Sequence, residues 1–236
     1  MAMVDGSTCL RDAALELALP YPTGTNPYTT PEVQIQQLLS LANAMGQELA
    51  REYAWTALQK LLTVSVVAGT VLYALPADWN GLLPGTAYAN GTAWPLVGSL
   101  APSQWANLTA WGGSVGGGYF RIQGDKLEVS PGTPTQVLKL AYRSLWWAGT
   151  ASGVLSSEEM SATAPAHVYD RRLMVNAVKN AFNEARGFDS TSSSGWLERA
   201  LSRAKGSDGT PPVLELGRSP GTGLGGVNLP YTNWGK

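Results

Sequence analysis

Apolar side chains recur at helical spacing near the start of the chain. Residues 7–19 read STCLRDAALELAL and place Leu10 and Ala14 on one side of a helix. Ser7 or Thr8 is the expected N-cap, because a hydroxyl at that position accepts a hydrogen bond from a free amide of the first turn. The pattern predicts a short helix with one apolar face.

A second and longer helix is expected after Pro31. Thr29 and Glu32 have the spacing of a capping box, and Pro31 falls in the first turn, where no amide partner is lost. We expect this helix to end between residues 53 and 58. Its apolar face has alternating three- and four-residue spacing, and its members are Ile35, Leu38, Ala42, Met45 and Leu49.

The apolar spacing then becomes alternating, which predicts strands. Residues 62–76, LTVSVVAGTVLYALP, alternate on both sides of a turn at Gly69 and predict a hairpin. Residues 119–132 predict a second hairpin that turns at Gly124, and residues 136–147 supply a further strand. PSQWANLTAW, in between, is expected to be a short helix. Several short strands separated by turns favour an antiparallel sandwich or a small barrel.

Helical spacing returns in the last third of the chain. Residues 167–187 predict a helix that stops at Gly187. A shorter helix, SGWLERALSRAKG, is expected to turn Trp196, Leu197 and other apolar residues inward. The segment that follows is rich in Gly and Pro and cannot form a core of its own.

The predicted fold class is α+β. Helices from both ends of the chain form a bundle, and an antiparallel β-sandwich or barrel is inserted between them. The expected division is residues 1–60 for the N-terminal helices, 61–150 for the β-domain, 151–206 for a loop and the C-terminal helices, and 207–236 for an extended Gly/Pro-rich arm.

Composition points to a surface that is shared with other molecules. Only 14% of the residues are charged, and nine are tryptophan. Interface cores are depleted of charge and enriched in aromatic residues, so extensive subunit contacts would explain this composition. A sandwich core rich in tryptophan is the alternative explanation.

Charge is unevenly distributed, although the net charge of the chain is only −1. The whole chain is therefore not expected to bind nucleic acid or a membrane surface. Residues 1–60 carry three basic and six acidic groups, whereas residues 166–206 carry seven basic and four acidic groups. These two regions could face each other within one subunit or between neighbours. Arg171 and Arg172 are accordingly candidates for contacts with an acidic partner helix.

The sequence contains no recognisable catalytic constellation, and we expect neither an enzyme nor a cofactor or metal. Its single histidine, His167, is expected at a helix start, as part of a cap or facing solvent. Glu158 and Glu159 are neighbours in a loop, whereas a glycosidase needs two carboxylates across a cleft. Asp78 is interpreted as a turn residue that bonds its own backbone. The single cysteine, Cys9, excludes an intrachain disulfide, and no apolar run is long enough to span a membrane.

Three segments together resemble the head-to-tail adaptor proteins of short-tailed phages, also called connector or tail tubular proteins. They are LLSLANAMGQELAREYAWTAL, VAGTVLYALPADWNGLLPGTAY and YFRIQGDKLEVSPGTPTQVLKLAYRS, in this order along the chain. The resemblance implies a structural protein in the neck or tail of the virion, assembled in the host cytoplasm. Relatives of this kind form a ring, typically dodecameric, beneath the portal protein. They also contact tail nozzle or fibre proteins, and DNA passes through the ring without specific binding.

A ring subunit would have a use for the C-terminal arm. We expect Leu229, Tyr231 and Trp234 to become ordered on a partner, by strand addition or by insertion of aromatic rings into pockets. The alternative function is a carbohydrate- or receptor-binding β-sandwich module of a phage tail, in which Trp146 and Trp147 would stack on sugars. Against it, one of these rings is expected to be buried in the sheet and the other to cover a helix joint.

Overall fold

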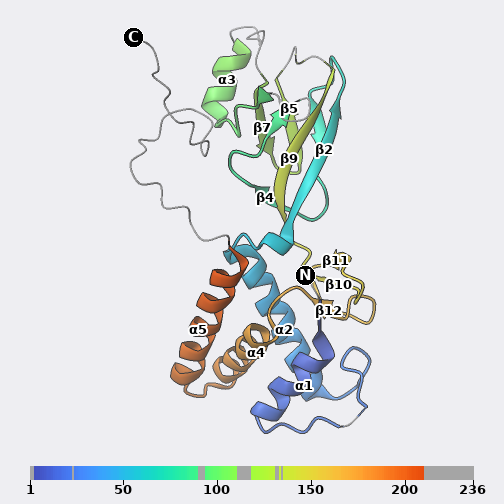
Figure 1. Cartoon of the computed structure of the whole chain (residues 1–236), viewed down its shortest axis with the longest axis vertical. Helices are drawn as coiled ribbons and strands as arrows, with labels where there is room; N and C mark the ends of the chain where they lie inside the picture. Colours follow the sequence, from blue (N-terminus) through green and yellow to red (C-terminus); the bar gives the residue numbers. More distant parts are fainter. Residues whose placement is uncertain are drawn as a thin grey trace, which may run out of the picture.

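The computed structural model has two lobes that lie one above the other (Figure 1). We call residues 3–58 and 145–209 the helical lobe and residues 59–144 the sheet lobe. The expected α+β class is confirmed, since helices from both ends of the chain form one lobe and the antiparallel strands between them in sequence form the other. The residues that the structure describes are 3–22, 24–89, 94–110, 118–130, 133 and 135–209.

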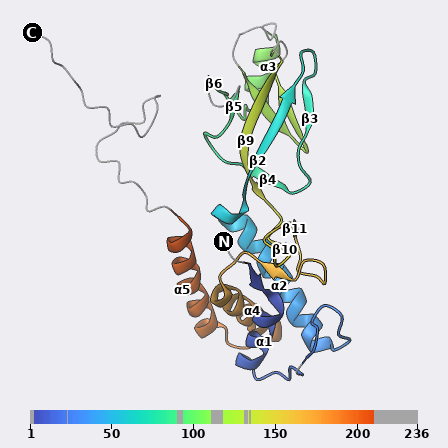
Figure 2. The ribbon, with the colours of Figure 1, turned by 45° about the vertical axis from the view of Figure 1, so that its right-hand side comes forward.

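Four main helices form the helical lobe, and α5 lies along one side of it in both views (Figures 1 and 2). A small four-stranded sheet of order β1-β12-β10-β11 covers the other side. The helices are α1 (Gly6–Glu16), α2 (Val33–Glu52), α4 (Arg171–Arg186) and α5 (Thr191–Asp208). The strands are β1 (Val4–Asp5), β10 (Ala148–Gly149), β11 (Leu155–Ser157) and β12 (Ala166–His167).

Both predicted N-terminal caps are wrong, although the helices themselves are confirmed. The N-cap of α1 is Asp5, whose Oδ2 accepts hydrogen bonds from the backbone amide of Thr8 at 3.0 Å and from its hydroxyl at 2.7 Å. Before α2, Glu32 makes no side-chain cap. Its amide donates to Thr30 Oγ1 at 3.3 Å, which replaces the expected capping box.

The helices α4 and α5 differ from expectation at their ends. Gly187 has a left-handed φ of 70° and caps α4 as predicted. The helix begins at Arg171, because Asp170 accepts hydrogen bonds from the amides of Arg172 and Leu173. In α5, Trp196 was expected inside but is 56% exposed, and the residues packed on the core are Leu197, Ala200, Leu201 and Ala204.

A close contact between α2 and Trp147 centres the core of the helical lobe. The Trp147 ring is fully buried, and a Cβ at Gly46 would lie 2.2 Å from its Cζ2. Tyr169 packs beside Trp147 with ring centroids 5.6 Å apart and donates its hydroxyl to the Gly46 carbonyl at 2.9 Å. Only glycine therefore fits this turn of α2. The predicted core residue Met45 is half-buried instead.

The sheet lobe is a sandwich of two open sheets. One has the order β2-β9-β5-β6, with β4 also paired to β9, and the other has the order β3-β8-β7. The core between them contains Val64 and Leu138 from the first sheet and Phe120 and Leu127 from the second. In the described residues these sheets do not close into a barrel. The strands are β2 (Gln59–Val66), β3 (Leu72–Ala74), β4 (Trp79–Leu82), β5 (Tyr88–Ala89), β6 (Trp94–Pro95), β7 (Phe120–Gln123), β8 (Lys126–Val129) and β9 (Gln136–Ser144).

The predicted hairpin over residues 62–76 does not form. The turn itself exists, with Gly69 at a φ of 88°, but β2 pairs with β9 and β3 pairs with β8. The chain therefore crosses from one sheet to the other at this turn, because both arms bury their alternate residues between the sheets. The hairpin of β7 and β8 and the strand β9 are confirmed, as is the rim helix α3 (Pro102–Ala110).

Replacing Gly46 by alanine tests the Trp147 contact. Alanine normally stabilises a helix interior by about 1 kcal/mol relative to glycine. Here the added methyl group overpacks the core, so we expect Gly46→Ala to lower the free energy of unfolding by about 1–3 kcal/mol in urea denaturation. Gly195→Ala in α5 is the matched control, since a Cβ there meets nothing within 4 Å and should stabilise. Equal effects of the two substitutions would contradict the contact.

Candidate functional site

A buried carboxylate joins the strands at the end of the sheet lobe that meets the helices. Asp78 is 3% exposed, and it does not bond its own backbone as the sequence suggested. Its Oδ2 accepts hydrogen bonds from Lys60 Nζ and Ser144 Oγ, both at 2.6 Å, and its Oδ1 accepts one from the Tyr142 hydroxyl at 3.0 Å. These donors lie on β2 and β9, so one side chain holds both strands and the turn before β4.

The same cluster fixes the segment through which the chain returns to the helical lobe. The Asp78 carbonyl accepts a hydrogen bond from the amide of Leu145 at 2.7 Å. Lys60 Nζ lies 4.7 Å from the ring centroid of Trp146, and the next residue, Trp147, is already in the core of the helical lobe. We call Lys60, Asp78, Tyr142 and Ser144 the joint cluster, because it lies where the two lobes connect.

The joint cluster keeps its carboxylate ionised. Burial alone would raise the pKa of Asp78, but hydrogen bonds from Lys60, Ser144 and Tyr142 outweigh it and hold this pKa below its usual value. Burial and the Asp78 carboxylate together raise the pKa of Tyr142 to about 12. At neutral pH the Asp78 carboxylate is therefore charged, and the Tyr142 hydroxyl keeps its proton.

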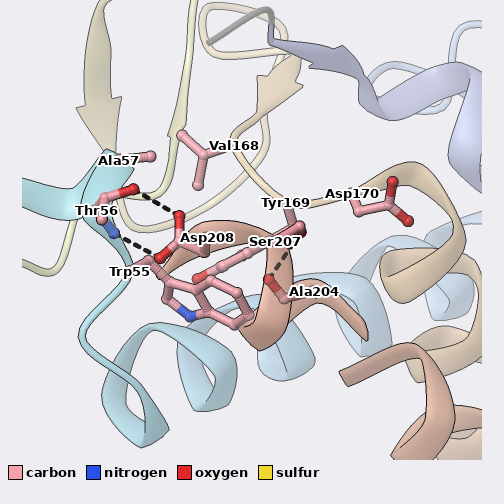
Figure 3. A pocket seen from close by; sticks show the side chains of 9 residues that line it. All are labelled: Trp55, Thr56, Ala57, Val168, Tyr169, Asp170, Ala204, Ser207 and Asp208. Carbon is pink, nitrogen blue, oxygen red and sulfur yellow. Dashed lines mark hydrogen bonds between the residues drawn. The ribbon is translucent and has the colours of Figure 1, made fainter. Parts of the chain in front are cut away.

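A hollow of about 310 Å³ lies beside the joint, between α5 and the short 3₁₀ helix η1 (Thr56–Leu58) (Figure 3). At its mouth, Asp208 accepts hydrogen bonds from the amide of Thr56 at 2.8 Å and from its hydroxyl at 2.6 Å. An acidic residue at a helix C-terminus interacts unfavourably with the helix dipole. The two hydrogen bonds from Thr56 offset this cost and explain why Asp208 stands at the end of α5. The residues around the hollow are Trp55, Thr56, Ala57, Val168, Tyr169, Asp170, Ala204, Ser207 and Asp208.

The hollow is not arranged for acid–base chemistry. Both of its carboxylates are already hydrogen-bonded, Asp170 as the N-cap of α4 and Asp208 to Thr56. The remaining walls are aromatic rings, methyl groups and hydroxyls. The hollow is of interest for its position, because residue 209, the last residue of the helical lobe, lies beside it and the predicted arm follows in the sequence.

Arg171 and Arg172, the predicted contacts to an acidic helix, bind acidic residues of α1 in the same chain. Arg171 Nε donates to Asp12 Oδ2 at 2.7 Å, and Arg172 donates to Glu16 at 2.6 Å. Lys179 also donates to Glu16 at 2.6 Å. The oppositely charged regions therefore face each other within one subunit. A contact of these two arginines with another protein stays a prediction. The other predicted interface residues, Leu229, Tyr231 and Trp234, lie outside the described residues.

Cys9 and His167 form a buried pair that the sequence did not predict. His167 lies in the strand β12 and not at a helix start, and its Nε2 is 3.2 Å from Cys9 Sγ. Burial raises the pKa of the Cys9 thiol to about 12 and lowers the pKa of His167 to about 4. Both groups are neutral at pH 7, and a neutral thiol is a poor nucleophile. The His167 imidazole is fully buried, so it cannot reach a substrate.

The two neighbouring tryptophans do not form a sugar platform. Trp147 is fully buried in the helical lobe, and Trp146 is half-buried beneath the Lys60 ammonium group. A sugar needs an open aromatic face for stacking, and Trp147 offers none.

Among the described helices, none combines the length and the hydrophobicity that a membrane span requires.

Besides the Cys9–His167 pair, three features of the site were missed from the sequence. The Asp78 contacts join residues far apart in the chain, and Asp208 is the second residue of the expected arm. Trp196 is exposed because Leu197, Ala200, Leu201 and Ala204 form the face of α5 that packs on the core. Only Asp208 carried a local signal, since an acidic residue is unfavourable at a helix C-terminus.

Removing the Asp78 charge should weaken the joint. Asp78→Asn removes the negative charge opposite the Lys60 ammonium and replaces one of the two accepting oxygens by an amide donor, so we expect the free energy of unfolding at pH 7 to fall by about 1–3 kcal/mol. The depressed pKa stabilises the folded state above the ordinary Asp value of 3.8, and this contribution is lost as the pH falls below it. Urea titrations at pH 7 and pH 3 should therefore differ less for the variant. Asp125→Asn, in an exposed turn, is the control and should behave like the parent chain.

The buried histidine predicts a second pH dependence. The unfolded chain protonates His167 near its ordinary pKa of 6.5, whereas the folded chain does so only near 4. The unfolded state thus binds more protons between these values, and stability should decrease as the pH falls from 6.5 to 4. His167 is the only histidine of the chain. Urea denaturation of His167→Gln should lose most of the slope between pH 7 and pH 5, and an unchanged slope would contradict the assignment.

Comparison with known proteins agrees with the resemblance found in the sequence. No curated protein matches the chain. A model of the SU10 adaptor protein family matches residues 7–211, a range that includes the sheet lobe and continues just beyond α5. The match covers well over half of the chain and both lobes. The chain therefore belongs to the SU10 adaptor protein family and is a structural adaptor protein of a phage.

Proposed function

We propose that this adaptor protein forms a homo-oligomeric ring that joins the portal protein to the tail and serves as a conduit for DNA. The observation that carries the proposal is the family match, because it extends over both lobes and over the two segments that connect them. The proposed partners are further copies of the chain, the portal protein, and tail nozzle or fibre proteins. We place the ring in the neck of the virion and its assembly in the host cytoplasm.

The surface of the chain supports such a role. Large apolar side chains are more than half exposed on both lobes, although only 14% of all residues are charged. A subunit that buries much of its surface against neighbours would have this composition. The low content of basic residues also suits a conduit, since DNA must move past the wall of the ring without being bound to it. The exposed residues are Leu15, Val33, Leu61, Val67, Val97, Val154, Phe188 and Trp196.

The start of the arm supports contact with a second molecule. The Asp208–Thr56 contact fixes residue 209 beside the joint between the lobes. The 27 residues after it would reach about 90 Å if fully extended, which is enough to cross a neighbouring subunit. We propose that the arm binds the portal protein or an adjacent subunit through Leu229, Tyr231 and Trp234, with Arg171 and Arg172 as further contacts.

A truncation tests the role of the arm. Deleting residues 210–236 keeps Asp208 and its contact with Thr56, so the melting temperature should stay within about 2 °C of the full chain. Binding to purified portal protein, measured by co-sedimentation, should weaken by at least about tenfold, because a tethered second contact is lost.

A full-length variant with Leu229, Tyr231 and Trp234 replaced by serine separates the side chains from the length of the arm. It should bind the portal as weakly as the truncated chain. If the truncated chain binds the portal as well as the full chain does, the arm does not work in this way.

A further inference from the structure

The outer face of α5 is built like the centre of a protein interface. Ser192, Trp196, Arg199 and Arg203 recur at helical spacing along it, and all four are exposed. The Arg199 guanidinium lies 4.1 Å from the Trp196 ring centroid, and its Nε donates to the Gly195 carbonyl at 3.0 Å. Tryptophan and arginine are the residues most enriched among interface hot spots. We call Trp196, Arg199 and Arg203 the α5 stripe.

The basic groups of the α5 stripe form no ion pair within the part of the chain that the structure describes. Unlike Arg171, Arg172, Lys179 and Lys205, which pair with acidic residues of α1 and α2, Arg199 and Arg203 make no ion pair with the described residues. Glu198 is the nearest acidic residue in sequence, but it lies about 100° around the helix from Arg199. The stripe therefore presents an apolar ring and two positive charges to the outside.

An acidic and apolar segment lies on the opposite side of the helical lobe. Val154, Glu158 and Glu159 belong to the connection around β11, and Figures 1 and 2 both place β10 and β11 across the lobe from α5. Val154 is 61% exposed, and neither glutamate makes an ion pair with the described residues. We call Val154, Glu158 and Glu159 the β11 segment.

The β11 segment is held firmly by α2. Asn43 Oδ1 accepts a hydrogen bond from the amide of Met160 at 2.8 Å, and Asn43 Nδ2 donates to the Met160 carbonyl at 3.4 Å. The amide of Glu159 donates to Ser157 Oγ at 3.0 Å. The backbone of the connection that carries the two glutamates is therefore preorganised, and binding would not need to order it.

We propose that the α5 stripe of one subunit binds the β11 segment of the next subunit in the ring. This inference rests on the proposed function. The apolar Trp196 faces the apolar Val154, and the two arginines face the two glutamates. Two different, complementary surfaces on opposite sides of one subunit make a head-to-tail contact, and a head-to-tail contact that rotates by a constant angle closes into a ring. The occupant of each surface is a second copy of this chain.

A charge-swap experiment tests the pairing. The variants are Arg199→Glu/Arg203→Glu, Glu158→Lys/Glu159→Lys, and the combination of all four. Each pair of reversals places like charges opposite each other, so the concentration needed for half-maximal ring formation on purified portal should rise at least about tenfold. The fourfold variant restores opposite charges at every contact and should return to within about threefold of the parent chain. Native mass spectrometry counts the subunits on each portal.

Arg11→Glu/Lys126→Glu is the control, because it changes the net charge as much as the arginine pair does, at exposed residues outside both surfaces. It should leave ring formation unchanged. The pairing is overturned if neither reversal weakens the ring, or if both weaken it and the fourfold variant does not recover. In either case the parent chain still forms its ring, so the proposed function stands. A parent chain that forms no ring on the portal would overturn both.

Discussion

The ionised carboxylate of Asp78 is the interaction that holds the end of the sheet lobe together where the chain passes to and from the helices. It is nearly buried, and its three side-chain donors come from the two long strands whose lower ends meet the helices. Breaking such a cluster would leave an unpaired buried group, which costs far more than a surface contact contributes. The turn at Pro76, where the amide of Trp79 donates to the Pro76 carbonyl, places the Asp78 carboxylate at the ends of β2 and β9 that meet the helices.

The main helices and several of the strands could be predicted because their signals are local. The apolar faces of α2 and α4, the Gly187 stop and the β7–β8 hairpin each depend on residues close together in the sequence. Strand partners could not be predicted in this way. The alternation around Gly69 fits a hairpin and a crossing between sheets equally well, and only the distant strands β8 and β9 decide between them. The Asp78 cluster and the Cys9–His167 pair join distant residues and gave no local signal.

The uneven distribution of charge along the sequence has two explanations in the structure. Most basic groups of α4 pair with α1 inside the subunit, where exposed ion pairs contribute little stability and mainly set the orientation of the helices. What remains on the outside of α5 is a tryptophan with two arginines, a combination better suited to a partner than to water. The structure thus separates charges that hold the subunit together from charges available to a neighbour, and the composition alone could not do so.

We propose that this chain works as one of many copies in a closed assembly. Single-particle electron microscopy of the full chain mixed with purified portal protein would show the assembly itself. We expect a closed ring with rotational symmetry, in which helical lobes lie side by side and α5 is buried between neighbours. Portal particles that carry isolated copies, or none, would contradict it.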